Sequence, residues 1–217
     1  MTDIFGNMQM ATSLKVLALI TFLAVLPILV LSLTSFTRII VVLGLLRQGM
    51  GLREAPPSPV LVALALFLTF FIMRPTFERI NQEAIQPYLH HEITEKEAFD
   101  RAIKELRKFM LKQTKEKDLM TFASSAGIPR PRNPDDLPTS VVIPAFITSE
   151  LKTAFQIGFM IYLPFLIIDL IVSSVLLSLG MIMLPPMLVS LPFKLLLFVL
   201  VDGWNLVITS LVKSFVP

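Results

Sequence analysis

Three charged residues of this sequence lie within otherwise apolar stretches: Asp169, Lys194 and Asp202. A charge in hydrocarbon costs about 2.5–3.5 kcal/mol even on the membrane-insertion scale, so each is expected to face a charged partner or a water-filled space. Carboxylates in such positions can pair with a cation or bind an ion. Glu150 lies where the stretch holding Asp169 begins, and it is interpreted either as a solvated interfacial charge or as a functional charge.

The depth of these charges depends on a turn expected near Pro185 and Pro186. Asp169 lies about sixteen residues before the turn and Asp202 about sixteen after it, so the two acids of one chain are expected at the same depth. Lys194, only about eight residues beyond the turn, would miss both acids by roughly 12 Å. We therefore expect Lys194 to pair with an acid of an axially displaced neighbouring chain.

The turn itself is rich in methionine. Met181 and Met183 lie in it and Met187 lies nearby, between a glycine and prolines that interrupt helical structure. Irregular backbone at membrane depth survives only where protein buries it or water reaches it, so the turn should line a cavity, a pore or a subunit contact. The alternatives are a solvent-exposed loop, and methionines that serve only as apolar filler.

Composition indicates that these residues belong to an all-α integral membrane protein. Of 217 residues, 54% are hydrophobic and 16% are charged, which excludes a disordered chain and disfavours a soluble globule. Residues 16–37 carry no charge and, at about 1.5 Å per residue, reach roughly 33 Å, enough to cross hydrocarbon of about 30 Å. No basic region precedes Lys15, so this run is expected to be a first span and not a signal peptide.

The remaining apolar runs predict kinked helical hairpins. Residues 60–73 form a second span of marginal length. Residues 153–193 and 195–212 are expected to be two helices folded back on each other through the methionine-rich turn. The chain then divides into N-terminal hydrophobic helices (1–73), a polar helical insert (74–152) and a C-terminal hairpin (153–217).

The orientation follows from the loop expected between the first two spans, which carries Arg38, Arg47 and Arg53 against the single acid Glu54. The positive-inside rule places this loop in the cytoplasm, so the insert is expected on the periplasmic side.

The insert is predicted to be helical. Thr94 and Glu97 have the capping-box spacing that begins a helix. The amphipathic run that follows carries apolar residues at helical spacing: Phe99, Ile103, Leu106 and Met110. Asp118 is expected to cap a shorter helix that extends to Gly127, followed by an extended proline-rich connector.

Two phenylalanines of the insert, Phe109 and Phe122, have two interpretations. A two-helix unit this small does not easily bury both apolar faces, so these side chains could contact a neighbouring subunit. The pattern is equally consistent with closure of the insert's own core.

Charge and residue types exclude several function classes. Residues 74–152 hold 13 of the 19 Lys and Arg and 12 of the 16 Asp and Glu, so no basic stripe for nucleic acid exists. The chain has no cysteine, and its histidines, His90 and His91, are adjacent in the insert and expected to face solvent. We expect no catalytic residues, no metal site and no cofactor.

Several runs with polar residues at set places resemble a known family. They are Leu33-Thr34-Ser35-Phe36-Thr37-Arg38, Ile143-Pro144-Ala145-Phe146, Ser149-Glu150-Leu151-Lys152, Pro164-Phe165-Leu166-Ile167-Ile168-Asp169, Leu191-Pro192-Phe193-Lys194 and Val201-Asp202-Gly203-Trp204. Together they resemble the FliP family of flagellar export-gate proteins, which is related to the SctR subunits of injectisomes. The resemblance covers most of the chain.

The resemblance implies a non-enzymatic subunit of the flagellar basal body in the bacterial inner membrane. Such subunits assemble as a pentamer with FliQ and FliR, work with FlhB and FlhA, and form the gated pore through which unfolded flagellar proteins are exported. The methionine-rich turn of the family closes the pore, which implies this role for Met181 and Met183; the family has three methionines in a row, whereas Ile182 stands here in the middle, and Met187 is a weaker candidate. The family also implies assembly contacts at Glu150 and at the two insert phenylalanines.

The sequence also bears on two other function classes. Broken helices, with Asp169 and Asp202 as ion ligands, are also typical of a small-solute transporter, although no inverted repeat is evident. An intramembrane hydrolase is disfavoured because the sequence lacks a Gly-x-Ser-x-Gly or His-Glu-x-x-His motif.

Overall fold

The computed structural model describes residues 30–52, 54–129, 133–181 and 183–215, with residues 16, 17, 20, 21, 23–25 and 27. The predicted first span, 16–37, lies partly outside the described residues. Within the described residues the chain is helical without strands, which confirms the all-α prediction. The elements are α2 (Phe36–Gly49), α3 (Ser58–Ile80), the π-helix η1 (Asn81–Ile85), α4 (Gln86–Leu89), α5 (Glu95–Gln113), α6 (Glu116–Ser125), the 3₁₀ turn η2 (Pro134–Asp136), α7 (Thr139–Ser178), α8 (Pro186–Leu200) and α9 (Gly203–Lys213).

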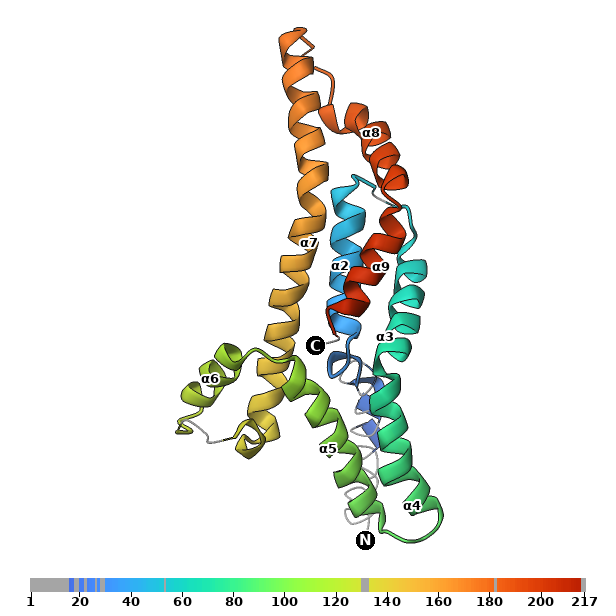
Figure 1. Cartoon of the computed structure of the whole chain (residues 1–217), viewed down its shortest axis with the longest axis vertical. Helices are drawn as coiled ribbons and strands as arrows, with labels where there is room; N and C mark the ends of the chain where they lie inside the picture. Colours follow the sequence, from blue (N-terminus) through green and yellow to red (C-terminus); the bar gives the residue numbers. More distant parts are fainter. Residues whose placement is uncertain are drawn as a thin grey trace, which may run out of the picture.

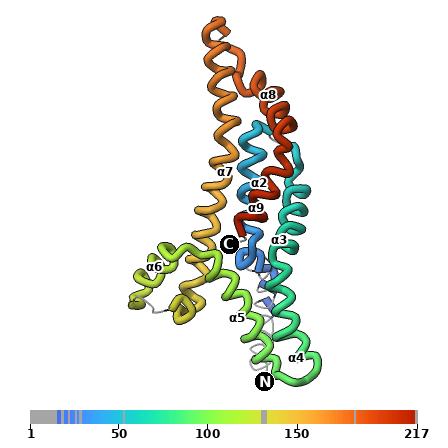
Figure 2. Tube along the Cα trace, viewed as in Figure 1, coloured from blue at the N-terminus to red at the C-terminus, as the bar shows by residue number. Residues whose placement is uncertain are grey.

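The described helices form an elongated bundle (Figure 1). Helix α7 runs along one side, and α8 and α9 return beside it to the level of α2, as the tube trace also shows (Figure 2). Helix α3 lies on the other side of α2, and α6 projects from the beginning of α7. The hairpin between α7 and α8 and the turn after α4 therefore lie at opposite ends of the molecule.

Among the described residues, two helices are long and apolar enough to cross a membrane, Ser58–Leu89 and Thr139–Ser178. The number rises to four if each of two bent helix pairs forms one span, and one of these pairs is α8 with α9, bent by 64°. The predicted hairpin of two apolar arms is confirmed, with a break in its second arm.

The second span is longer than the sequence predicted. Helix α3 does not end at residue 73 but continues through η1 and α4 as one helical stretch of 32 residues. Arg74 and Glu78, one helical turn apart, form an exposed ion pair at 2.8 Å, so these charges lie on the surface of a continuing helix. The length of the uncharged run therefore underestimated the length of this helix.

The loop predicted around the arginines is largely helical. Arg38 and Arg47 lie within α2, and Arg53 is outside the described residues. Arg47 Nη1 donates to Ser58 Oγ at 2.9 Å and so joins the end of α2 to the beginning of α3. The connection between α2 and α3 is thus shorter than expected. Just before α2 the chain turns at 33–35, where Thr34 Oγ1 donates to the Leu31 carbonyl at 2.7 Å and interrupts the predicted first span.

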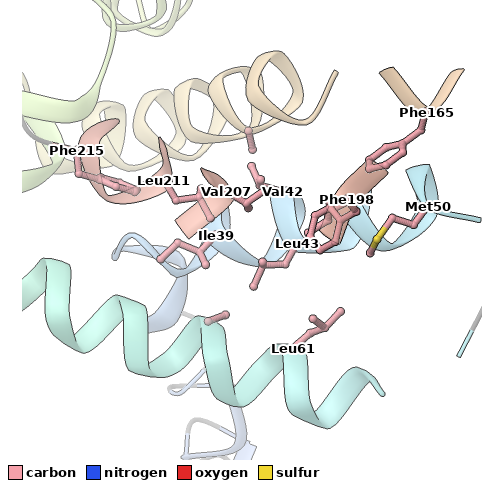
Figure 3. Close-up of a cluster of buried hydrophobic side chains, with 13 residues drawn as sticks. Ile39, Val42, Leu43, Met50, Leu61, Phe165, Phe198, Val207, Leu211 and Phe215 are labelled. Carbon is pink, nitrogen blue, oxygen red and sulfur yellow. The ribbon is translucent and has the colours of Figure 1, made fainter. Parts of the chain in front are cut away.

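The hydrophobic core is centred on α2 (Figure 3). Side chains from α3, α7, α8 and α9 pack against it, and Ile39, Val42 and Leu43 are fully buried. Two glycines allow α2 to approach α7 closely. A Cβ at Gly158 would lie 2.2 Å from Leu45 Cδ1, and one at Gly49 would lie 2.9 Å from Tyr162 Cδ2.

The insert forms the two predicted helices, with one difference at the second. The capping box that begins α5 is present: the Thr94 amide donates to Glu97 Oε2 at 2.9 Å and the Glu97 amide donates to Thr94 Oγ1 at 3.3 Å. Asp118 does not cap α6, because Lys115 is the N-cap and the Asp118 side chain is buried in an ion pair with Lys152 of α7. Gly127 adopts a positive φ of 69° just after α6, as a helix-ending glycine does.

Candidate functional site

The hairpin tip is built by a glycine turn between α7 and α8. Gly180 has a φ of 74°, which glycine adopts without strain. The Gly180 amide donates to the Leu177 carbonyl at 3.1 Å, and the Met181 amide donates to the Leu176 carbonyl at 2.9 Å, which closes the end of α7. Pro185 then precedes α8, so the two arms are joined by a short, defined turn.

The methionines of this tip are open to the surroundings. Met183 is 97% exposed, and Met181 and Met187 are 49% and 52% exposed. Ile182, between the first two, lies outside the described residues. Met183 is almost fully exposed and therefore has no packing role within the chain, so the apolar-filler interpretation does not describe it.

A buried polar cluster lies below the tip, where α8 packs against α7 and the end of α2. Lys194 Nζ lies 2.6 Å from Asp169 Oδ2 and donates to the Gly49 carbonyl at 3.2 Å. Ser190 Oγ donates to Asp169 Oδ1 at 2.6 Å. Lys194 is only 2% exposed, so this ion pair fixes the two arms of the hairpin to each other and to α2.

The prediction that Lys194 needs a neighbouring chain as partner is wrong. The error came from placing the apex of the hairpin at Pro185, whereas α7 already ends near Gly180. The second arm therefore begins its return at Gly180 and not at Pro185. Lys194 consequently reaches the depth of Asp169 in the same chain.

Asp202 lies apart from Asp169. It is exposed, adopts a positive φ of 50° at the break between α8 and α9, and accepts a hydrogen bond from Asn205 Nδ2 at 3.2 Å. Since Lys194 is level with Asp169, Asp202 lies about two helical turns farther along, and the predicted shared depth is wrong. No group of three or more His, Asp or Glu side chains that could hold a metal ion occurs among the described residues.

A second buried ion pair joins Glu150 of α7 to Arg38 of α2. Glu150 is fully buried, and Arg38 Nε donates to its Oε2 at 2.9 Å. Arg38 Nη1 also donates to the Ser214 carbonyl at 2.8 Å, Nη2 donates to Gln113 Oε1 at 3.3 Å, and the guanidinium lies 3.7 Å from the centre of the Phe215 ring. We call this group the Arg38 junction.

The Arg38 junction connects α2, α5, α7 and the C-terminal end of α9. It excludes the interpretation of Glu150 as a solvated interfacial charge. Sequence reasoning missed Arg38 because it was counted as a topology signal in a loop. A usable signal was present: Arg38 stands within a long apolar region, and a second isolated charge, Glu150, stands in another.

The two insert phenylalanines contact their own chain. Phe109 is half-buried, with its ring centre 5.9 Å from that of Phe146 and 6.5 Å from that of Phe215. Phe122 is half-buried against the cluster that includes Met110 and Leu119. These contacts favour closure of the insert's own core, and part of each side chain is still available to a neighbour.

Comparison with known proteins decides the family. The sequence model of the FliP family matches residues 19–211. The chain belongs to the FliP family. The flagellar biosynthetic protein FliP of Aquifex aeolicus is 51% identical over 212 residues, which are 97% of this chain and 89% of the relative. Membership makes the protein a membrane component of the flagellar export apparatus.

Two further relatives support the assignment over nearly the full chain. FliP of Bacillus subtilis is 50% identical over 207 residues, 95% of this chain and 94% of the relative. FliP of Pectobacterium carotovorum is 52% identical over 210 residues, 97% of this chain and 81% of the relative. The family resemblance in the sequence motifs is thereby confirmed.

Proposed function

We propose that this chain forms part of the gated pore of the flagellar type III export gate, and that its methionine tip closes the pore. The observation that carries this proposal is the exposure of Met181, Met183 and Met187 at the end of a long apolar hairpin. A ring of such tips, one from each copy, would present flexible thioether side chains to the axis. Methionine is unbranched and polarizable, so it can seal against ions and still yield to an unfolded chain of varied composition.

The apolar surface of α7 supports assembly into an oligomer. Phe155, Phe159 and Met160 are 56%, 61% and 72% exposed on one part of the helix. Surfaces of this kind are covered by lipid or by other subunits. We propose a pentamer with FliQ and FliR, which works with FlhB and FlhA and passes unfolded flagellar proteins.

The insert has a supporting role in this proposal. The exposed parts of Phe109 and Phe122 contact a neighbouring subunit, and Glu150 contributes by holding the Arg38 junction, which fixes α5 against α7. The division into anchoring helices (1–73), insert (74–152) and closing hairpin (153–217) describes three functional parts, although α3 and α7 each continue across a boundary. The role is that of a conduit and not of a catalyst.

We further propose that the protein lies in the inner membrane at the flagellar basal body, with the insert on the periplasmic side. The support is the positive charge at the connection between α2 and α3. Arg47 lies next to this connection, and Arg53 belongs to it. Arg38 no longer counts toward this orientation, because it is committed to its buried ion pair. The hairpin tip then faces the cytoplasmic side, where export begins.

A cross-linking experiment tests whether the tips meet. The chain has no cysteine of its own, so a Met183→Cys variant in the complete gate offers one thiol per copy. Mild oxidation is expected to link copies through the tip. The control is Glu95→Cys, exposed at the beginning of α5 near the opposite end of the molecule (Figure 1). A fully assembled gate in which Met183→Cys links no more than the control would refute the proposal.

A further inference from the structure

The turn after α2 lies against the first turns of α8. At Gly51 the backbone adopts a φ of 78°, a conformation that strains most residues with a side chain. A Cβ there would lie 3.7 Å from Met187 Cγ, 3.9 Å from Lys194 Nζ and 4.0 Å from Leu191 Cδ1. These three residues are spaced by four and three positions, so they share one face of α8. That face of α8 therefore packs against the glycine.

Polar contacts attach the same part of α8 to the end of α2. Lys194 Nζ donates to the Gly49 carbonyl at 3.2 Å and pairs with Asp169 of α7. Arg47 Nη1 donates to Ser58 Oγ at 2.9 Å, which joins the end of α2 to the beginning of α3. Helix α8 thus packs against a turn that is itself held at both ends.

The link from this turn to the methionine tip is short and stiff. Three residues separate Met183 from Met187. Two of them are prolines, Pro185 and Pro186, whose rings fix φ near −65°. A displacement of the beginning of α8 would consequently be transmitted to Met183.

We propose that Gly51 is a positioning residue of the pore seal, because its left-handed conformation lets the turn after α2 support the beginning of α8. A residue that requires a negative φ would shift this turn, and with it α8 and Met183. The inference rests on the proposed closing role of the methionine tip, and it gives Met187 a second role, which is to hold the tip in place. Met183 is 97% exposed, so its position depends on the residues that hold the tip.

The ion leak across cells that express the complete gate tests this role. Gly51→Ala places a side chain at a positive φ, while its Cβ would make only ordinary contacts, so the expected effect comes from the backbone. We expect a leak above that of the native gate. Gly51→Asn is expected to keep the gate tight, because asparagine adopts the left-handed conformation more easily than alanine.

The matched control is Gly127→Ala in the insert, where φ is 69° and a Cβ would meet nothing within 4 Å. This variant carries the same kind of backbone strain away from the tip, and we expect no leak from it. A leak from Gly51→Ala alone supports the positioning role. Equal leaks from Gly51→Ala and Gly127→Ala would overturn it, because the effect would then be a general loss of stability.

A variant in which Met181 and Met183 are both Gly separates this inference from the proposed seal. If that variant leaks while an assembled Gly51→Ala gate is tight, the seal stands and the positioning role is overturned. If both gates are tight, the proposed seal is refuted, and the positioning role with it.

A second variant tests the inference if Gly51→Ala does not assemble. Leu191→Ala shortens a side chain that packs over Gly51 and lies outside the tip, and we expect it to leak. Its control is Leu196→Ala, the same change at a position of α8 that is 58% exposed. An assembled Leu191→Ala gate that is as tight as the Leu196→Ala gate would overturn the proposal.

Discussion

The Arg38–Glu150 pair shows how single residues hold the ends of four segments together. Both side chains are buried, and Arg38 satisfies its remaining donors on Ser214 and Gln113. A buried ion pair contributes little net stability compared with well-packed apolar residues. The pair instead fixes the relative positions of the segments that it joins. Loss of one partner would leave a buried charge without a counter-charge or water.

Replacing Glu150 by Ala is therefore expected to destabilise the chain by about 3–5 kcal/mol, because Arg38 would remain buried without its carboxylate. The measurement is the free energy of unfolding in detergent. The matched control is Glu78→Ala, which breaks an exposed ion pair with Arg74 and is expected to cost less than about 1 kcal/mol. Similar losses in the two variants would contradict this account.

The Asp169–Lys194 pair should respond asymmetrically, since Lys194 is 2% exposed and Asp169 is 33% exposed. Asp169→Ala leaves the buried ammonium group of Lys194 without a counter-charge, so we expect the free energy of unfolding to fall by about 3 kcal/mol or more. Lys194→Met leaves a carboxylate that can still reach its surroundings and keeps the Ser190 hydrogen bond, so a loss of about 1 kcal/mol is expected. The free energies of unfolding of the two variants measure this difference. A larger loss of stability for Lys194→Met than for Asp169→Ala would contradict the account.

Sequence reasoning at this scale found the residues but not their partners. Asp169 and Lys194 were recognised because an isolated charge in an apolar run is costly, and Glu150 because it lies at the entrance to such a run. Their pairing depends on where α7 ends, and a difference of five residues between Gly180 and Pro185 changes the depth of everything that follows. Arg38 was missed as a partner because its helix, α2, was read as a loop.

At the scale of elements, the close contact of α2 with α7 depends on two glycines, Gly49 and Gly158. A Cβ at Gly158 would meet Leu45, while a Cβ at Gly44, also in a helix, would meet nothing within 4 Å. Gly158→Ala is expected to destabilise the chain by about 1–3 kcal/mol through overpacking. Gly44→Ala is expected to be neutral or stabilising by up to about 1 kcal/mol. Thermal unfolding of both variants measures the difference, and equal midpoints would show that the helices adjust freely.

The capping box of α5 predicts a pH dependence. The pKa of the exposed Glu97 carboxyl is lowered, first by its hydrogen bond from the Thr94 amide and then by that from the Thr94 hydroxyl. A lowered pKa in the folded state means that this contribution to helix stability is present above the unfolded pKa and is lost as the pH falls through the folded pKa.

A carboxyl NMR titration of Glu97 is expected to show this lowered pKa. Thr94→Val, which removes the hydroxyl but keeps the backbone amide, is expected to raise it part of the way back. An unchanged Glu97 titration in Thr94→Val would show that the hydroxyl contributes nothing to the cap.

The helices themselves were largely predictable, since long apolar runs and the spacing of Thr94 with Glu97 specify them locally. The lengths of the helices were less predictable. Helix α3 passes Arg74 because an ion pair one turn apart keeps the charges on the helix surface. The break between α8 and α9 at Asp202 has no proline to indicate it. It brings Gly203 against Phe198, where a Cβ would lie 2.2 Å from Phe198 Cδ2.

For the whole molecule, the arrangement separates a rigid body from an exposed tip. The Arg38 junction and the Asp169–Lys194 pair fix α2, α7, α8 and α9 to one another, and the hairpin extends beyond them (Figure 1). The methionines at its tip are exposed. Such a construction positions the tip precisely while leaving its side chains adaptable. This is what a seal that must open for an unfolded chain requires.

The most direct test of this account is the ion leak across cells that express the complete gate, measured for the native chain and for a variant in which Met181 and Met183 are both Gly. The control replaces Leu89 of α4 and Phe99 of α5, which are also exposed but lie near the opposite end of the molecule, by Ala. The account predicts increased conductance only for the methionine variant, with the complex still assembled. An assembled methionine variant without a leak would contradict it and move the seal to another part of the gate.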